Sequence, residues 1–436
     1  MQIKNLFPQK IKNIYHLGQA GIAGLIYGFP SKNIKVIGVT GTNGKTTTCQ
    51  MVAKILEEAG KRVAMASTIN FKLGEKEWVN KTKFTTLSSF QVQKFVKEAV
   101  ENKCEYLILE VSSHSLDQYR VAGIKFHTAV ITNVTREHLD YHKTMTEYRL
   151  AKIKMFEDAR VVIANLDMEN PEEFLEFGEE KYGYTIENQK SKIKNKNDNL
   201  KCKIINAEDI ELGADGSIYK LKNINFKLNL PGSFNVENAL AATCVGLSEE
   251  INLEKIKMAL EKIKNVPGRL ESVENNKGIR IIVDYAVTPD SLEKLYEYVK
   301  TIREENSRII AVFGACGERD RGKRPIMGEI VGKNADLVIV TNEDPYREDP
   351  EQIIDEVFSG VVGINGDRTN LSHKEEKENC WRIMDRREAI KKALQIAKPG
   401  DIVVVTGKGA EETMAVGKKR IPWNDKKVIL EELEKS

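Results

Sequence analysis

The stretch GVTGTNGKTTT, residues 38–48, decides the fold of the first half of the chain. It follows a short apolar run, residues 34–39, and opens an amphipathic run, residues 45–59, so it joins a strand to a helix. Glycines let such a loop curl until its backbone N–H groups face a phosphate chain, and the dipole of the following helix favours the anion. We therefore expect a P-loop that binds a nucleoside triphosphate. Val39 breaks the usual GxxxxGK[ST] spacing, and only GxxGKT from Gly41 is present.

Two side chains of this loop carry the expected chemistry. Lys45 would reach the outer phosphates, and the hydroxyl of Thr46 would bind Mg²⁺. The other loop residues expected around the phosphates are Gly41, Thr42, Asn43, Gly44 and Thr47. The alternative is a glycine-rich turn without a ligand, which the strand–loop–helix context disfavours.

The composition excludes several classes of protein. A chain of 436 residues is long enough for two or three domains. Its 67 basic and 64 acidic residues nearly balance, so no basic face for nucleic acid is indicated. The six cysteines form no CxxC pair, which argues against a structural zinc site and a disulfide framework and favours the reducing cytoplasm.

Residues 14–30 are the best candidate for membrane contact. They carry no Asp, Glu, Lys or Arg, but they are shorter than the ~20 residues of a membrane span and are interrupted by glycine. We expect a helix that docks onto the protein's own body, which we favour over contact with a membrane surface. The segment also lacks the cleavage pattern of a signal peptide.

Short apolar runs alternate with amphipathic runs along most of the chain, a pattern typical of mainly parallel sheets covered by helices. The expected strands are residues 34–39, 62–66, 105–111, 128–133, 161–165, 279–284, 308–313, 336–341 and 402–406. The expected helices are residues 45–59, 89–102, 235–247, 253–263, 290–301, 324–333 and 386–396, and the polar stretch 187–200 is an expected loop. We predict an α/β protein with a short N-terminal segment, 1–32, a P-loop central ATPase domain with a mostly parallel sheet, 33–268, and a C-terminal Rossmann-like domain, 269–436.

Three further residues have metal-binding or nucleophilic chemistry. Glu110 ends one expected strand and His138 follows another, so both could hold a second Mg²⁺ beside the P-loop. Lys152 shares one face of an expected helix, residues 145–156, with Tyr148 and Phe156. A lysine among apolar groups has a lowered pKa and can react as the neutral amine. The alternative is a lysine that extends its ammonium group to solvent.

Several motifs in order resemble one family. TGTNGKTT, LEVSSHSLDQYRV, TNVTREHLDYH and EYRLAKIKMF are similar to the Mur ligases, and most similar to the MurE-type tripeptide synthetases. The resemblance implies ATP and Mg²⁺ as cofactors, and a carbamylated Lys152 that helps Glu110 and His138 to hold a magnesium ion. It also implies that the muramoyl-peptide acceptor is bound by Thr85, Thr86, Ser112, Gln118 and Arg120.

The resemblance continues into the second half of the chain. LPGSFNVENALAA matches the family motif whose second asparagine, Asn238, contacts adenine, while Asn235 is alternatively a helix N-cap. Arg269 and Asp284 correspond to residues near ATP. The motifs GACGERDRGKRPIMGE, DRREAI and GKGAE also match the family, and the resemblance implies an amino-acid site. Its expected residues are Arg324, Asp344, Tyr346, Gly407 and Glu411, with Glu411 binding the incoming ammonium group.

Five departures from the family pattern bear on the substrates. The P-loop begins only ~40 residues into the chain, less than an independent domain needs, so the usual domain that grips uridine nucleotides is not expected. The acceptor is therefore expected with or without UDP. Tyr346 stands where the DNPR motif has the arginine that pairs with diaminopimelate, and Arg347 beside it should point elsewhere. Val287 and Ala410 replace histidines, and Glu137 replaces a more common aspartate.

The implied reaction is the ATP-dependent addition of an amino acid to a muramoyl-dipeptide-like acceptor through an acyl phosphate, in cell-wall synthesis. The expected partners are small molecules, with no nucleic acid, and the expected state is a monomer. Three alternatives stay open: a sister ligase acting on a pseudomurein peptide or polyglutamate, a plain P-loop kinase or NTPase, and a non-catalytic binding subunit.

Overall fold

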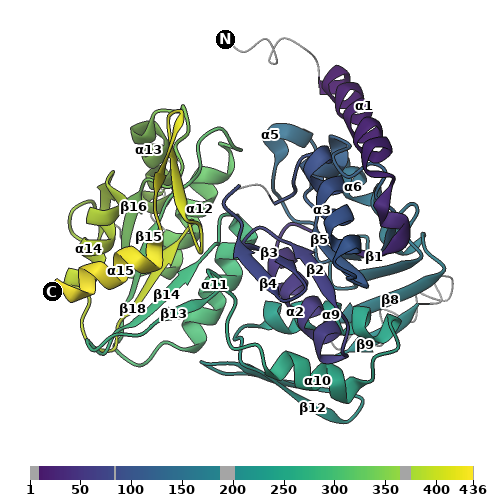
Figure 1. Ribbon diagram of the computed structural model, residues 1–436. Helices are drawn as coiled ribbons and strands as arrows, with labels where there is room; N and C mark the ends of the chain where they lie inside the picture. The colour runs from purple at the N-terminus through teal and green to yellow at the C-terminus, as the bar shows by residue number, and fades with distance from the viewer. Residues whose placement is uncertain (1–8, 83–84, 187–201, 364–374, 436) are drawn as a thin grey trace. The chain divides into compact units, whose positions relative to one another are not determined.

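The computed structural model describes residues 9–82, 85–186, 202–363 and 375–435. Contacts between residues divide the chain into two compact units (Figure 1). The first unit is Met1–Thr135 with Thr144–Lys264, and the second is Arg136–Lys143 with Asn265–Ser436. The eight residues 136–143 therefore group with the second unit, although their neighbours along the chain belong to the first. The boundaries at residues 32 and 268 stay predictions.

The first unit is built on a nine-stranded sheet with the order β4-β3-β2-β5-β1-β6-β7-β8-β9. All neighbouring strands from β2 to β9 in this order run parallel, whereas β3 and β4 pair antiparallel at one edge. The strands are β1 Lys35–Thr40, β2 Val63–Ala66, β3 Asn70–Leu73, β4 Lys76–Val79, β5 Tyr106–Glu110, β6 Phe126–Ile131, β7 Val161–Asn165, β8 Glu180–Thr185 and β9 Lys203–Asn206. The P-loop leaves the carboxyl end of β1, between β5 and β6.

Helices cover this sheet, with α1 packed on α3 and α2 packed on α9 and α10. The helices are α1 Gln9–Tyr27, the 3₁₀ turn η2 Pro30–Asn33, α2 Lys45–Glu58, α3 Ser89–Glu101, α4 Ser113–Asp117, α6 Met145–Ile153, α7 Glu172–Leu175, α9 Ser233–Ser248 and α10 Leu253–Glu261. A separate antiparallel sheet comprises β10 Glu208–Leu212, β11 Ser217–Leu221 and β12 Ile224–Leu228. Helix α1 buries small residues such as Ala20 and Ala23, as expected for docking on the protein's own body, and exposes Ile14, Leu25 and Ile26. Among the described residues, no helix is long and apolar enough to span a membrane.

The second unit has a six-stranded sheet with the order β13-β14-β18-β15-β16-β17, in which only β13 is antiparallel. Alternate residues of β15 face two hydrophobic clusters on opposite sides of this sheet. Ala311 and Phe313 pack in the cluster with Leu292 of α11, and Ile310 and Val312 pack in the cluster with Ile390 of α14. Helices therefore cover both faces, as in doubly wound sheets. The strands of this sheet are β13 Glu271–Val273, β14 Arg280–Asp284, β15 Ile309–Phe313, β16 Leu337–Thr341, β17 Cys380–Ile383 and β18 Ile402–Thr406. A separate antiparallel pair comprises β19 Thr413–Val416 and β20 Lys419–Pro422. The helices are α5 Leu139–His142, α11 Pro289–Thr301, α12 Lys323–Asn334, α13 Pro350–Val362, α14 Arg386–Ile396 and α15 Asp425–Glu434.

The predicted fold class is confirmed, and two local predictions are wrong. The helix predicted at 145–156 ends at Ile153, so Phe156 lies beyond it, although its ring stays buried. Asn235 is not an N-cap, because α9 already begins at Ser233 and the Asn235 amide donates to the Pro231 carbonyl at 2.7 Å. The expected loop at 187–200 lies outside the described residues.

Candidate functional site

The P-loop is fixed by its own glycines and by the segment that follows β6. Gly44 has a left-handed φ of +82°, and a Cβ there would lie 2.2 Å from Oδ1 of Asn238. The Thr42 and Asn43 N–H groups both donate to Asn133, to its backbone and side-chain oxygens respectively, at 2.9 Å. Asn133 and Asn238 therefore both lie against the loop and restrict its conformation.

Two lysines meet at one carbonyl oxygen of this loop. The Nζ atoms of Lys45 and Lys152 donate to the Gly41 carbonyl at 3.0 and 2.9 Å, and Lys45 also donates to the Thr42 carbonyl at 2.7 Å. Lys152 is 1% exposed and lies 4.4 Å from the centre of the Tyr148 ring, so the solvent-extended alternative is wrong. Burial, and then the nearby charge of Lys45, lowers the pKa of Lys152 well below its usual value.

Glu110 lies at the carboxyl end of β5 against the P-loop. The Thr46 hydroxyl donates to both of its carboxylate oxygens at 3.1 Å, and Glu110 is 2% exposed. Thr68, which sequence reasoning missed, donates to the same carboxylate from its N–H and its hydroxyl, both at 2.7 Å. Its position after the expected strand 62–66 was visible in the sequence, but the strand order that brings it beside Glu110 comes from the structure. A carboxylate beside a threonine hydroxyl offers the hard oxygen ligands that Mg²⁺ prefers.

The predicted acceptor residues fall into two groups. Thr85 contacts the Thr68 hydroxyl at 3.1 Å. Thr86 donates to the Glu110 carbonyl at 3.1 Å and accepts from the Ser112 N–H at 3.0 Å. These three residues, Thr85, Thr86 and Ser112, therefore lie next to Glu110. Gln118 and Arg120 bond to each other just after α4.

Asn238 lies against the P-loop, with its Oδ1 accepting from the Thr48 hydroxyl at 3.3 Å. Its amide donates to Asn235 at 3.3 Å. Thr47, in the first turn of α2, is buried. The structure therefore brings the asparagine motif to the nucleotide loop, 190 residues away along the chain.

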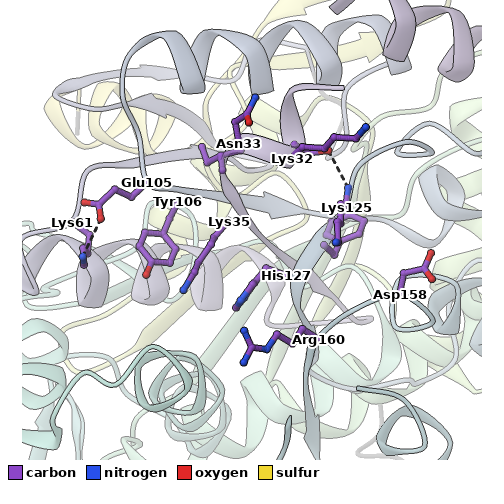
Figure 2. Close-up of a pocket in the computed structure, with 13 residues that line it drawn as sticks. Lys32, Asn33, Lys35, Lys61, Glu105, Tyr106, Lys125, His127, Asp158 and Arg160 are labelled. Carbon is purple, nitrogen blue, oxygen red and sulfur yellow. Dashed lines mark hydrogen bonds and ion pairs between the residues drawn. The ribbon is translucent and has the colours of Figure 1, made fainter. Parts of the chain in front are cut away.

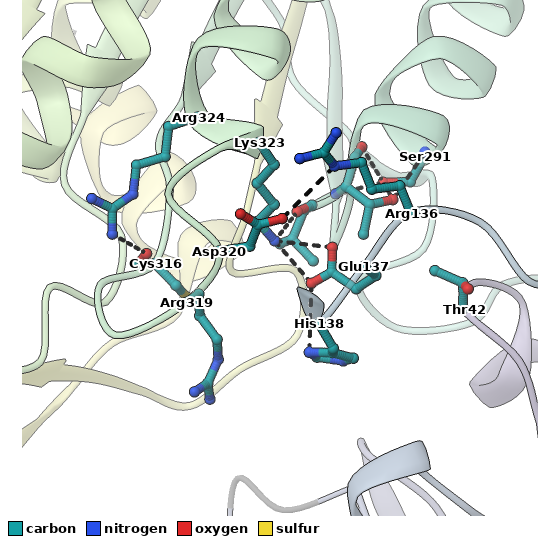
Figure 3. A network of polar contacts seen from close by, with 12 residues as sticks. Thr42, Arg136, Glu137, His138, Ser291, Cys316, Arg319, Asp320, Lys323 and Arg324 are labelled. Carbon is teal, nitrogen blue, oxygen red and sulfur yellow. Dashed lines mark hydrogen bonds and ion pairs between the residues drawn. The ribbon is translucent and has the colours of Figure 1, made fainter. Parts of the chain in front are cut away.

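His138 groups with the second unit, whereas Glu110 and Lys152 belong to the first. Its backbone has a left-handed φ of +58° at the start of α5. The preceding residue, Glu137, accepts from Nζ of Lys323 at 2.9 and 3.2 Å, as Figure 3 shows. The metal ligands predicted from the sequence are thus not all within one unit.

A buried charge cluster lies at the carboxyl ends of β16 and β18. Nζ of Lys408 donates to Asp344 at 2.8 Å and also bonds Glu411, while the Ala415 N–H donates to Asp344 at 2.6 Å. Burial opposes the charge of Lys408, but Glu411 and Asp344 outweigh it and raise the pKa of the lysine. A Cβ on Gly407 would lie 2.6 Å from Oε2 of Glu343, so Gly407 leaves room beside this neighbouring carboxylate.

The remaining predicted residues of the second unit have contacts of their own. Tyr346 is half-buried, with Arg319 over its ring at 5.7 Å, and Arg347 is exposed. Arg324 is fully buried and donates to Glu348 at 2.8 Å and Glu356 at 2.7 Å. Near residue 265, where the main part of the second unit begins, Arg269 lies over the Tyr285 ring at 4.5 Å. Asp284 accepts from the Leu270 N–H at 2.7 Å, and burial raises the pKa of Asp284.

A pocket of about 840 Å³ lies at the amino ends of β1, β5 and β6 in the first unit (Figure 2). It has several cationic side chains in its lining, but carboxylates pair with three of them. The pairs are Lys35–Glu249 at 2.6 Å, Lys61–Glu105 at 2.9 Å and Arg160–Glu179 at 3.4 Å. The P-loop leaves the opposite edge of the same sheet, so this pocket is separate from the predicted site.

Comparison with known proteins agrees with this geometry. Residues 39–246 match the Mur ligase middle domain, and residues 268–409 match the Mur ligase, glutamate ligase domain. A UDP-N-acetylmuramoyl-L-alanyl-D-glutamate–2,6-diaminopimelate ligase of Syntrophomonas wolfei is 38% identical over 94% of this chain and 80% of its own length. A UDP-N-acetylmuramyl-tripeptide synthetase of Roseiflexus is 37% identical over 93% of this chain and 80% of its own length.

Solved structures give the same result. The structure of a UDP-N-acetylmuramoyl-L-alanyl-D-glutamate–2,6-diaminopimelate ligase superposes with a TM-score of 0.58 and 29% identity, covering 92% of this chain and 78% of the other. Both large parts of the chain, the P-loop unit with its buried lysine and the doubly wound second unit, are included in these matches. The chain therefore belongs to the Mur ligase family, whose members are ATP-dependent ligases that form amide bonds.

Proposed function

We propose that the chain adds an amino acid to the carboxyl group of a UDP-muramoyl-dipeptide-like acceptor. The acceptor carboxylate attacks the γ-phosphorus of ATP, and ADP leaves. The amine of the amino acid then attacks the acyl phosphate, loses a proton and displaces phosphate, which leaves an amide bond. The observation that carries the proposal is the joint placement of Lys45, Thr46, Glu110 and Lys152 around one P-loop.

The residues at the P-loop fit a magnesium ion. Thr46 and Glu110 bring a hydroxyl and a carboxylate together at 3.1 Å, and Thr68 adds a second hydroxyl. In the proposal Thr46 and Glu110, with His138, hold Mg²⁺, which when bound offsets the negative charge of the phosphates. Lys45 and Arg269 stabilise the charge that develops on the transferring phosphoryl group, and Asn238 contacts the adenine.

Lys152 is proposed to act as a carbamate. Its lowered pKa raises the fraction of neutral amine over that of an ordinary lysine, and a neutral amine adds CO₂ to form a carbamate with release of one proton. The product is a carboxylate on a long side chain, which would serve as a further metal ligand. This proposal explains why a lysine is enclosed at a site without a carboxylate partner of its own among the described contacts.

The second unit is proposed to bind the incoming amino acid. Asp344 and Glu411 lie beside Lys408, and Glu411 would receive the ammonium group of the substrate. Tyr346 would line this site, and the exposed position of Arg347 supports the view that it does not replace an arginine there. We propose no single amino acid, because Tyr346 stands where the DNPR motif of MurE-type ligases has the arginine that pairs with diaminopimelate.

The test is phosphate release from ATP, measured with the product mass. Release should need both a UDP-muramoyl-dipeptide and one amino acid, and the product should have the mass of the tripeptide. Amino-acid-dependent release with a pseudomurein peptide or polyglutamate instead would move the chain to a sister ligase. Turnover without any amino acid across the panel would contradict amide synthesis.

A further inference from the structure

A buried ion pair anchors the segment that carries His138. The segment comprises Arg136–Lys143, which includes α5, and it groups with the second unit. Its contacts are drawn in Figure 3, where Lys323 and Glu137 point toward each other. Lys323 is the first residue of α12 and lies 186 positions from Glu137 along the chain.

All three N–H groups of the Lys323 ammonium have an acceptor. They bond Oε1 of Glu137 at 2.9 Å, Oε2 of Glu137 at 3.2 Å and the Val287 carbonyl at 2.8 Å. Lys323 is 4% exposed and Glu137 is 7% exposed. A cation at a helix N-terminus opposes the helix dipole, so this lysine depends on its carboxylate partner. The Val287 contact uses the backbone carbonyl, so the replacement of histidine by valine leaves it unchanged.

Because Lys323 holds the side chain of Glu137, the backbone position of the next residue, His138, is restricted. Adjacent Cα atoms are separated by ~3.8 Å, so a clamped side chain at one residue limits the backbone of the next. His138 has a φ of +58°, which L-residues adopt only against a steric penalty. Two further described ion pairs of the segment are long: Arg136 with Asp320 at 3.9 Å, in which the arginine is half-exposed, and His138 with Glu137 at 3.8 Å, which needs a protonated imidazole. The buried pair is therefore the stronger anchor.

We infer that Lys323 is a positioning residue, which holds His138 in its metal-binding conformation through Glu137. The inference rests on the proposed function in one respect, that His138 binds Mg²⁺. Lys323 lies next to the loop of residues 314–322, where Arg319 stacks on Tyr346 of the proposed amino-acid site. The same helix start thus links the loop beside the amino acid to the histidine of the metal site.

The test compares Lys323→Met, Glu137→Gln and the double variant with a matched control, Lys333→Met. Lys333 lies on the same helix and pairs with Glu329 at the surface. The readouts are the dissociation constant of Mn²⁺ with ADP present, measured by electron paramagnetic resonance, and the imidazole resonances of His138, assigned with His138→Gln. Thermal unfolding checks that each variant folds.

Each single variant should weaken Mn²⁺ binding about tenfold and shift the His138 resonances, and the double variant should be no worse than either single, because both remove one interaction. Glu137→Asp, which keeps the charge, should retain most of the affinity. Lys333→Met should change neither readout.

Unchanged Mn²⁺ affinity and unchanged His138 resonances in folded Lys323→Met would overturn the inference. If that variant does not fold, Glu137→Gln, which preserves the side-chain shape, decides in the same way. A His138→Gln protein with undiminished Mn²⁺ affinity would instead contradict the metal role in the proposed function, whatever the behaviour of Lys323.

Discussion

Lys152 in the first unit and Lys408 in the second are equally enclosed, with exposed fractions of 1% and 0%, yet their pKa values shift in opposite directions. Burial lowers the pKa of Lys152, and its described neighbours are a carbonyl, an aromatic ring and a second lysine. Burial acts on Lys408 in the same direction, but Glu411 and Asp344 reverse the result.

The comparison shows that burial alone does not decide what a lysine does. Without a carboxylate, an enclosed lysine is a reactive amine that can be modified; between two carboxylates, it is a permanent cation that fixes a loop. Both arrangements serve one proposed ligase, with Lys152 near the nucleotide loop and Lys408 beside the proposed amino-acid site. Four experiments can break or sharpen the contrast.

The largest expected effect is the loss of activity in Lys152→Met. Removing the proposed carbamate should lower kcat for amide synthesis about 1,000-fold, which is the size of effect seen when one preorganised electrostatic group is lost. The free energy of unfolding should change by less than about 1.5 kcal/mol, because methionine nearly conserves the volume. Steady-state kinetics and urea unfolding measure the two. Activity within tenfold of wild type would argue against a role for Lys152 in the reaction.

Lys408→Met should lower the folding stability much more than Lys152→Met does. The substitution leaves Asp344 and Glu411 enclosed without their cation, which costs about 3–5 kcal/mol of folding stability. Urea unfolding monitored by circular dichroism gives this value. A loss no larger than that of Lys152→Met would mean that the two sites do not differ in the way proposed.

Two glycines allow a matched test of the same regions. Gly44→Ala places a Cβ against Asn238, and Gly407→Ala places one against Glu343; both glycines have positive φ, at +82° and +111°. We expect Gly44→Ala to weaken ATP binding about tenfold and Gly407→Ala to raise the KM for the amino acid by a similar factor, since about 1.4 kcal/mol of strain is a factor of ten. Calorimetry with ADP and kinetics with varied amino acid separate them. If both substitutions weakened the binding of nucleotide and of amino acid equally, the assignment of Gly44 to the nucleotide site and Gly407 to the amino-acid site would be contradicted.

The smallest expected effect is a pH dependence of stability. The folded pKa of Lys152 lies below the ~10.4 of an unfolded lysine, so between these values the unfolded state binds more protons and stability rises with pH. Relative to Lys152→Met, the stability of wild type should rise from neutral pH toward pH ~10, the region in which the unfolded lysine keeps its proton. Lys408, with a raised pKa, contributes stability below ~10.4 that is lost as pH rises through its folded pKa. Unfolding in CO₂-free buffer measures both, and parallel curves for wild type and Lys152→Met would exclude the lowered pKa.

Local patterns in the sequence predicted most of the framework. The P-loop, the helix that follows it and the alternation of strands and helices depend on neighbours within about one turn or one strand, so periodicity was sufficient. The helix at residues 145–156 was predicted too long, since α6 ends at Ile153 and Phe156 is buried outside the helix. An apolar residue with helical spacing does not show by itself that the helix continues.

Ion pairs between residues far apart in the sequence could not be predicted from local patterns. Lys408 meets Asp344 across 64 positions, and Lys323 meets Glu137 across 186. Both lysines were visible as members of charged motifs, but a motif does not say which carboxylate it contacts. Thr68 was missed for the same reason, because its two bonds to Glu110 depend on the order of strands in the sheet.

The bonds from Lys45 to two carbonyl oxygens of its own loop have a consequence for inhibitor chemistry. A ligand with an uncharged oxygen would only replace one hydrogen bond from Lys45 to a carbonyl by another of similar strength. Its binding free energy therefore improves little. A phosphonate or sulfonate forms a charge-assisted bond about twice as strong, so it can displace the loop carbonyls. These Lys45–carbonyl bonds therefore disfavour uncharged ligands, and fragment screens against the loop should be weighted toward anions.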